Sequence, residues 1–248
     1  MTDEKSMVYR ALVDTSMINE RRDVHIAGLL RIMETMLEEH LLDIAMDNPR
    51  LVREQNCSWL FLSLCTEVQD AVAPGEVLLG RTWYSGRKGP LFRRELELCH
   101  EDGSRAVAAS FFSGLIDLGT RKILRDRAFL ERYTLPEGEI LLQADSRMAA
   151  DPQGYRETGR QQVRPSWLDA LGHVNNARYG DMIYDQLCGK DTLPPGALRR
   201  LELYFVGELR CFEEVSLLRK DEESFSSVLG LHGATGESTF CSRVFLDR

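Results

Sequence analysis

The sequence DALGHVNNARY, residues 169–179, contains the strongest structural signal in the chain. Gly172 permits a tight or left-handed turn, and His173 follows it at the expected start of a helix over residues 174–187. Backbone N–H groups in the first turn of a helix have no partners inside the helix. Asp169, four residues before His173, is expected to reach the same place from the preceding loop.

This arrangement permits two interpretations. In the first, the Asp169 carboxylate acts as a base or nucleophile while the helix N–H groups polarise a carbonyl oxygen, and hydrolysis of an ester or thioester needs both. In the second, Asp169 only caps the helix, and Asn175 and Asn176 satisfy nearby backbone groups. The spacing alone leaves both interpretations open.

The rest of the chain divides into two halves with the same order of elements. Apolar residues recur every three or four positions over residues 25–46, which predicts an amphipathic helix. Strands of the first half are expected at 58–64, 76–84, 91–100 and 106–117. Strands of the second half are expected at 161–167, 200–208, 214–221, 225–232 and 238–246. A less apolar connection over 126–157, with a short helix near 129–133, separates the halves, and their common order indicates an internal duplication.

The pattern D-x-x-G-H-V-N-N-x-x-Y at 169–179 resembles the signature of hot-dog-fold thioesterases. The whole chain resembles the acyl-[acyl-carrier-protein] (acyl-ACP) thioesterases of bacteria and plants. Further matches follow in the family's order: WLFLSL (59–64), PGEV (74–77), RTW (81–83), FRR (92–94), DLGTR (117–121), FVGE (205–208) and EEV (213–215). The resemblance implies an α+β fold of two tandem hot-dog domains, each an antiparallel sheet wrapped around a long helix.

The resemblance also implies domain boundaries and a function. We expect an N-terminal hot-dog with an acyl-chain groove over 1–125, a connection over 126–157, and a C-terminal hot-dog with the catalytic residues over 158–248. The implied activity is hydrolysis of fatty acyl-ACP, which releases free fatty acid and ends fatty-acid elongation. Asp169 matches the family's catalytic Asp, as general base or nucleophile, and His173 and Glu208 match its other catalytic residues. The substrate-binding candidates are Asn175, Asn176 and Trp59.

Four positions depart from the family pattern. Leu171 stands where the family has an Asn that helps to position water or the thioester carbonyl, and Asn175 is a candidate for part of that role. The cysteine once proposed as a nucleophile in plant members falls at Leu209, so that position offers no thiol. Phe205 replaces a Tyr and Phe212 a Gly. Two alternatives therefore stay open: a thioesterase for acyl-CoA or another small thioester, and a catalytically silent acyl-binding protein.

Composition restricts the remaining functions. The chain of 248 residues has a net charge of −8, which disfavours non-specific nucleic-acid binding. It has no apolar run of the ~20 residues that span a bilayer and no apolar signal core near its first residue, so we expect a cytoplasmic protein. Its six cysteines form no CxxC pair and its five histidines no HExxH motif. We expect no metal and no cofactor.

An acidic carrier protein requires a local basic surface on its partner. The first candidate surface consists of five basic residues within 81–94: Arg81, Arg87, Lys88, Arg93 and Arg94. A second one follows the first set of strands and consists of Arg121, Lys122, Arg125 and Arg127. Either cluster is equally typical of a solvated face. The oligomeric state stays open between monomer and homodimer.

The first half has its own histidine near a helix start. The stretch RRDVHIAGLLRIMETM resembles LDALGHVNNARYGDMI, and we take His25 as the counterpart of His173, with Asp23 two residues before it. The first half lacks the Asn-Asn pair, so we expect it to have lost the chemistry and kept an apolar groove. Met33, Met36 and Met46 suit either an adaptable acyl tunnel or plain core packing.

Overall fold

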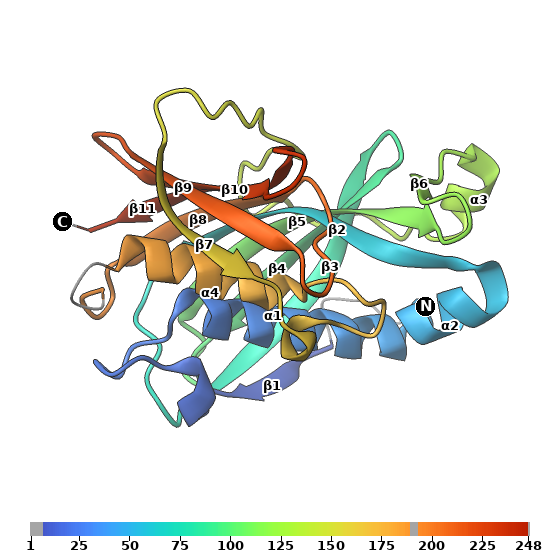
Figure 1. Cartoon of the computed structure of the whole chain (residues 1–248). Helices are drawn as coiled ribbons and strands as arrows, with labels where there is room; N and C mark the ends of the chain where they lie inside the picture. Colours follow the sequence, from blue (N-terminus) through green and yellow to red (C-terminus); the bar gives the residue numbers. More distant parts are fainter. Residues whose placement is uncertain (1–6, 189–192, 248) are drawn as a thin grey trace. The chain divides into compact units, whose positions relative to one another are not determined.

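The computed structural model describes residues 7–188 and 193–247, which fold into two compact units (Figure 1). The first unit comprises Met1–Leu12, Ile32–Gln69 and Val77–Ser146, and the second comprises Val13–Arg31, Asp70–Glu76 and Arg147–Arg248. The two units are defined by which residues lie close in space, so each contains segments from both halves of the chain. The boundaries at 125 and 158 therefore stay a prediction about domain organisation.

The first unit contains an antiparallel sheet in the order β1-β3-β4-β5-β2, with β6 added on β5. Its strands are β1 (Tyr9–Leu12), β2 (Cys57–Val68), β3 (Val77–Lys88), β4 (Leu91–Cys99), β5 (Arg105–Asp117) and β6 (Lys122–Ile123). Its short helices are α2 (Asn48–Gln55) and α3 (Arg127–Glu131). Small and apolar side chains make β5 almost wholly buried, as expected for a strand inside a sheet.

The long helix α1 (Ile26–Asp43) begins in the second unit and continues into the first. Its apolar stripe includes Met33 and Met36, which are fully buried. Gly80 on β3 leaves the space for the Met36 sulfur, since a Cβ atom there would lie 2.0 Å from it. The structure therefore shows these two methionines packed in the core.

The second unit contains an antiparallel sheet in the order β8-β11-β10-β9-β7. Its strands are β7 (Arg156–Gln162), β8 (Leu198–Phe205), β9 (Glu214–Asp221), β10 (Ser226–His232) and β11 (Ser238–Leu246). Helix α4 (Asn176–Leu187) packs against β9 and β10 (Figure 1). Two short 3-10 helices, η2 (Thr15–Met17) and η3 (Pro165–Trp167), precede α1 and α4.

Most expected elements are present, with differences at their ends. The strand expected over 161–167 ends at Gln162, because Pro165 begins η3 instead. The strand expected to reach Glu208 ends at Phe205. The short elements α2 and β6 were not expected, since two to eight residues carry too little periodicity to be recognised. In the part of the chain that the structure describes, no helix is long and apolar enough to cross a bilayer.

Candidate active site

Asp169 closes a tight turn immediately before α4. Its Oδ1 accepts the backbone N–H groups of Leu171 at 2.8 Å and His173 at 3.1 Å. Gly172 adopts φ +79°, a left-handed conformation that glycine tolerates without strain. The carboxylate is exposed, and no described residue donates to its Oδ2. One oxygen is thus fixed by the loop while the other faces solvent.

His173 and Glu208 form the second part of the site. The His173 Nε2 lies 3.1 Å from the Glu208 Oε2, and both side chains are partly buried. Glu208 lies in the loop after β8, not on the strand as we expected. The next residue, Leu209, is fully buried and its carbonyl accepts the Val174 N–H at 3.0 Å. This backbone bond fixes the Glu208 loop to the Asp169 loop.

Gly207 allows this loop to approach β11 closely. The N–H groups of Val206 and Gly207 both donate to the Thr239 carbonyl, at 2.8 and 2.9 Å. A Cβ atom on Gly207 would lie 3.1 Å from the Ser238 carbonyl oxygen. Glu208 is therefore positioned from both sides, by β11 and by the Asp169 loop.

The helix starts later than we expected. Asn175 is the N-cap, its Oδ1 accepts the Ala177 N–H at 3.0 Å, and α4 begins at Asn176. The N–H groups of His173, Val174 and Asn175 donate to Asp169, Leu209 and Trp167. The prediction that N–H groups next to His173 are available for a carbonyl is therefore wrong. Among the described groups of this turn, the Asn176 N–H has no acceptor within the chain.

The second interpretation of the motif is correct for Asn175, which caps the helix. It is wrong for Asp169, because this side chain closes the preceding turn and does not cap α4. Leu171 contributes only its N–H to that turn, and its side chain is 42% exposed. Any residue except proline can donate that N–H, so an Asn at this position is not needed for the turn.

The loop before α1 has the same geometry as the loop before α4. Asn19 Oδ1 accepts the N–H groups of Arg21 at 2.9 Å and Asp23 at 3.1 Å, as Asp169 does for Leu171 and His173. The bridges Ile18–Val24 and Leu168–Val174 also correspond. These matches set an offset of 150 residues between the two loops.

This offset corrects the role of His25. The counterparts of Asp169 and His173 are Asn19 and Asp23, and His25 is the counterpart of the N-cap Asn175. Accordingly, His25 Nδ1 accepts the Gly28 N–H at 3.0 Å. The sequence alignment was wrong by two positions because it matched the two histidines. The four-residue spacing of Asn19 and Asp23, which repeats that of Asp169 and His173, is the signal that identifies the correct offset.

Tyr179 lies close enough to Glu208 and Asp169 to feel their charges, although the sequence analysis assigned it no role. Its side chain is buried and its ring contacts Phe205 and Phe240 at centroid distances of 5.4 and 5.2 Å. Burial and the negative charges of Glu208 and Asp169 raise the pKa of the Tyr179 phenol. The phenol therefore stays protonated at neutral pH and adds no charge to the site.

The first unit contains an apolar pocket that includes Trp59. The Trp59 Nε1 donates to the Met46 carbonyl at 2.8 Å, and its ring contacts Phe92 edge-on. The pocket is lined mainly by apolar side chains from α1 and the sheet, with a few polar ones: Leu37, Glu38, Leu41, Met46, Asn48, Trp59, Phe61, Tyr84, Phe92, Arg94, Phe111, Ser113 and Tyr133. Its apolar lining is of the kind that contacts a hydrocarbon chain, but its volume in this structure is about 40 Å³, far below the ~300–1,000 Å³ of a typical ligand site.

The basic residues within 81–94 do not form one exposed surface. Arg94 is buried, Arg93 is nearly buried and pairs with Glu95, and Arg87 lies 2.9 Å from Glu131. Only Arg81 and Lys88 of this cluster are exposed. Their spacing in sequence indicated a surface patch, but these side chains point to different faces of the β3–β4 hairpin. All four residues of the second cluster are exposed.

Comparisons with known proteins agree with this geometry. Residues 152–241 match the family model of the acyl-ACP thioesterase C-terminal domain. The structure is similar to an acyl-ACP thioesterase from Bacteroides thetaiotaomicron, with a TM-score of 0.83 and 19% identity over 99% of this chain and 100% of that one. It is also similar to the 12:0-ACP thioesterase of Umbellularia californica, with a TM-score of 0.78 and 13% identity over 97% of each chain. Among curated proteins no sequence match is found.

These findings confirm the expected α+β fold of two tandem hot-dog domains, and the match to the C-terminal domain model supports the expected family. The matched residues 152–241 include Asp169, His173 and Glu208. The match supports thioester hydrolysis as the class of activity.

Proposed function

We propose that this chain, whose residues 152–241 match the acyl-ACP thioesterase C-terminal domain model, hydrolyses fatty acyl-ACP, releases the free fatty acid and so ends fatty-acid elongation. The main support is the 3.1 Å contact between His173 and Glu208 beside the exposed carboxylate of Asp169. The three side chains come from two loops that a backbone bond joins. This is an arrangement of acid and base groups suited to acyl transfer to water.

In the proposed reaction, the Asp169 Oδ2 takes a proton from a water molecule whose oxygen attacks the thioester carbonyl carbon. Alternatively, Oδ2 attacks the carbon directly and gives an anhydride that water then opens. The hydrogen bonds to Oδ1 hold the carboxylate in one orientation for either step. When the carbon–sulfur bond breaks, His173 supplies a proton to the leaving thiolate, and Glu208 orients the imidazole for that transfer.

The developing negative charge on the carbonyl oxygen requires a donor. We assign this role to the Asn176 N–H, because the preceding N–H groups already have acceptors. It lies at the start of α4, where the helix dipole also favours negative charge. One such donor is typically worth a factor of about 10²–10³ in turnover.

The acyl chain is proposed to bind in the apolar pocket of the first unit, with Trp59 as one of its walls. Asn175 and Asn176 are proposed to contact the substrate near the thioester. Acyl-CoA presents the same thioester on a different carrier. A panel of carriers decides between them.

The test is release of free fatty acid from acyl-ACP thioesters, octanoyl to stearoyl, with the matching acyl-CoA thioesters alongside. Asp169→Ala should lower turnover by about 10²–10⁴-fold, the usual contribution of a general base. Unchanged unfolding by denaturant shows that the variant is folded. A variant with more than about half of the wild-type rate would refute Asp169 as the base or nucleophile, given that factor.

Leu171 favours one second candidate, a silent acyl-binding protein. Its exposed apolar side chain stands in the turn where the family has an Asn. If the wild-type chain binds acyl-ACP without turnover and Leu171→Asn introduces hydrolysis, the silent function is correct. Turnover by the wild-type chain excludes it.

A further inference from the structure

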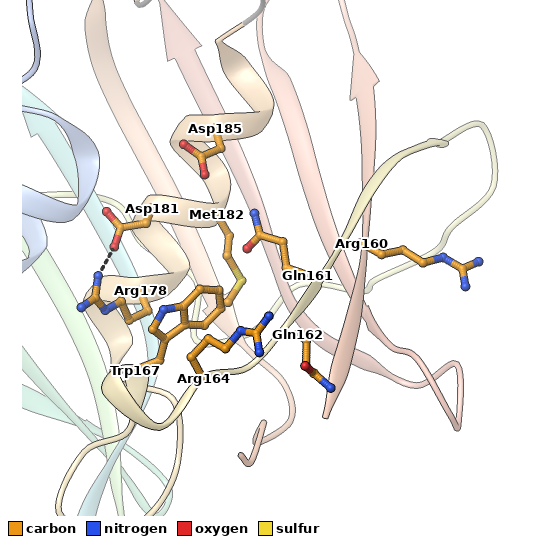
Figure 2. Close-up of a pocket in the computed structure, with 9 residues that line it drawn as sticks. All are labelled: Arg160, Gln161, Gln162, Arg164, Trp167, Arg178, Asp181, Met182 and Asp185. Carbon is orange, nitrogen blue, oxygen red and sulfur yellow. Dashed lines mark hydrogen bonds and ion pairs between the residues drawn. The ribbon is translucent and has the colours of Figure 1, made fainter. Parts of the chain in front are cut away.

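A second pocket lies in the same unit as Asp169, between β7, η3 and α4 (Figure 2). Its volume is about 440 Å³ and it is lined by Arg160, Gln161, Gln162, Arg164, Trp167, Arg178, Asp181, Met182 and Asp185. This is the size of a small-ligand site. The proposed catalytic steps use none of these side chains.

Three arginines and two aspartates are among the residues that line the pocket. Asp181 is already paired with Arg178 at 3.0 Å and with Arg31 at 3.7 Å. Burial and the neighbouring Asp181 raise the pKa of Asp185 above its ordinary value. Arg164 is exposed, and its guanidinium has no ion-pair or hydrogen-bond partner among the described residues.

Figure 2 shows the Arg164 guanidinium turned toward the centre of the pocket, next to the Trp167 indole. Arg160 extends away from the other lining residues, and Glu157 holds it at 2.7 Å. The two arginines thus line one pocket but differ in orientation and pairing. A guanidinium presents a planar set of donors that fits phosphate oxygens.

The pocket is directly connected to the catalytic loop. Trp167 is two residues before Asp169, and its carbonyl accepts the N–H of the N-cap Asn175 at 2.9 Å. Arg178 lies in the first turn of α4. A molecule held on Trp167 and Arg164 is therefore held against the same rigid loop that positions Asp169.

We infer that this pocket binds the phosphate of the phosphopantetheine arm that carries the acyl group, with Arg164 as its main ligand and Trp167 as an apolar wall for the arm. The inference rests on the proposed function, because acyl-ACP presents the thioester on such an arm. The arm has the thioester at one end and the phosphate at the other. The pocket adjoins the catalytic loop through Trp167, and Asp169 is not among its lining residues.

The test compares one acyl chain on phosphopantetheine and on pantetheine, which lacks the phosphate. Arg164→Ala should raise the KM for acyl-phosphopantetheine about tenfold, equivalent to about 1.4 kcal/mol, with kcat unchanged. The KM for acyl-pantetheine should not change. Arg156→Ala is the matched control, because Arg156 is an exposed arginine of β7 that does not line the pocket, and it should leave both constants unchanged. An equal effect of Arg164→Ala on both substrates, or no effect on either, would overturn the inference.

Binding without turnover separates this inference from the proposed function. Calorimetric titration with phosphopantetheine should show affinity that Arg164→Ala weakens about tenfold, while the nucleotide half of coenzyme A should not bind. If phosphopantetheine binds in this way but no thioester is hydrolysed, the proposed function fails and the pocket assignment stands. If thioesters are hydrolysed but phosphopantetheine binding does not depend on Arg164, the pocket assignment is wrong. Binding of the nucleotide half alone would also overturn it.

Discussion

At the scale of single residues, the second unit contains two histidine–glutamate pairs that differ in their surroundings. His173 and Glu208 are 3.1 Å apart beside Asp169, and His232 and Glu213 are 3.4 Å apart. Glu208→Gln should lower kcat by about 10–10²-fold, because an amide cannot stabilise the protonated imidazole that returns a proton to the thiolate.

Glu213→Gln is the matched control for that variant. It removes the same charge from the other pair and should leave kcat within about twofold of wild type, since that pair has no part in the proton transfer. Steady-state hydrolysis of one acyl thioester measures both variants. Equal losses in the two would mean that a general change in charge, and not the His173–Glu208 pair, affects the rate.

At the scale of elements, α1 and α4 begin with the same capping geometry, which different residues provide. The N-caps are His25 for α1 and Asn175 for α4, and each side chain accepts a backbone N–H. Burial lowers the pKa of His25 in the folded state. The unfolded chain therefore binds the proton more readily than the folded chain does.

This difference predicts how stability depends on pH. The contribution of His25 is fully present above its unfolded pKa, ordinarily about 6.5, and is lost as the pH falls through that value toward the lower folded pKa. His25→Asn keeps a capping oxygen, as Asn175 does, and removes the titration. The measurement is denaturant unfolding between about pH 5 and pH 8, which is about one and a half units on either side of the ordinary pKa. The free energy of unfolding should fall less steeply toward acid pH in His25→Asn than in the wild type. An identical pH dependence in both proteins would contradict this account.

The turn at Gly172 gives a second prediction at this scale. Gly172→Ala meets no neighbouring atom within 4 Å but must adopt φ +79°, so it should lower the free energy of unfolding by about 1 kcal/mol. Gly159 on β7 also has open space around it but no left-handed φ, so Gly159→Ala should be neutral or slightly stabilising. If both variants lost the same stability in denaturant unfolding, the effect would not come from backbone conformation.

The two loops also show how far the sequence predicted the structure. Periodicity and turn residues predicted the long helix and most strands, and the family resemblance, not the local motif alone, indicated Asp169, His173 and Glu208 as one group. Neither could place the helix start, because Asn175 and Asp169 are both good caps and only the fold decides which one is used. The sequence also could not show that Arg93 and Arg94 are buried. Whether a charged side chain of a strand is exposed depends on what covers the sheet, which is a tertiary property.

At the scale of the whole molecule, a buried charge attaches the connection between the halves to the first sheet. Glu95 on β4 is fully buried and accepts hydrogen bonds from Ser85 Oγ at 2.7 Å, the Leu141 N–H at 3.2 Å and Ser110 Oγ. Arg93 lies 2.7 Å from Glu95 and also donates to the Leu142 carbonyl. The pair therefore holds residues 141 and 142 on the sheet.

Removing either partner leaves the other charge buried without compensation, which typically costs about 3–5 kcal/mol. Glu95→Ala and Arg93→Ala should each lower the free energy of unfolding by that amount, and the double variant should lose clearly less than their sum. Arg81→Ala is the control, because Arg81 pairs with Glu97 at 3.7 Å and is half exposed, and it should lower the free energy of unfolding by less than about 1 kcal/mol.

Denaturant unfolding measures all four variants, and limited proteolysis measures whether residues 136–160 become accessible. Losses that add within about 0.5 kcal/mol would show that the two side chains act independently. In that case the connection is held by its apolar contacts, such as Leu142 with Cys65 and Ala108, and not by the buried pair.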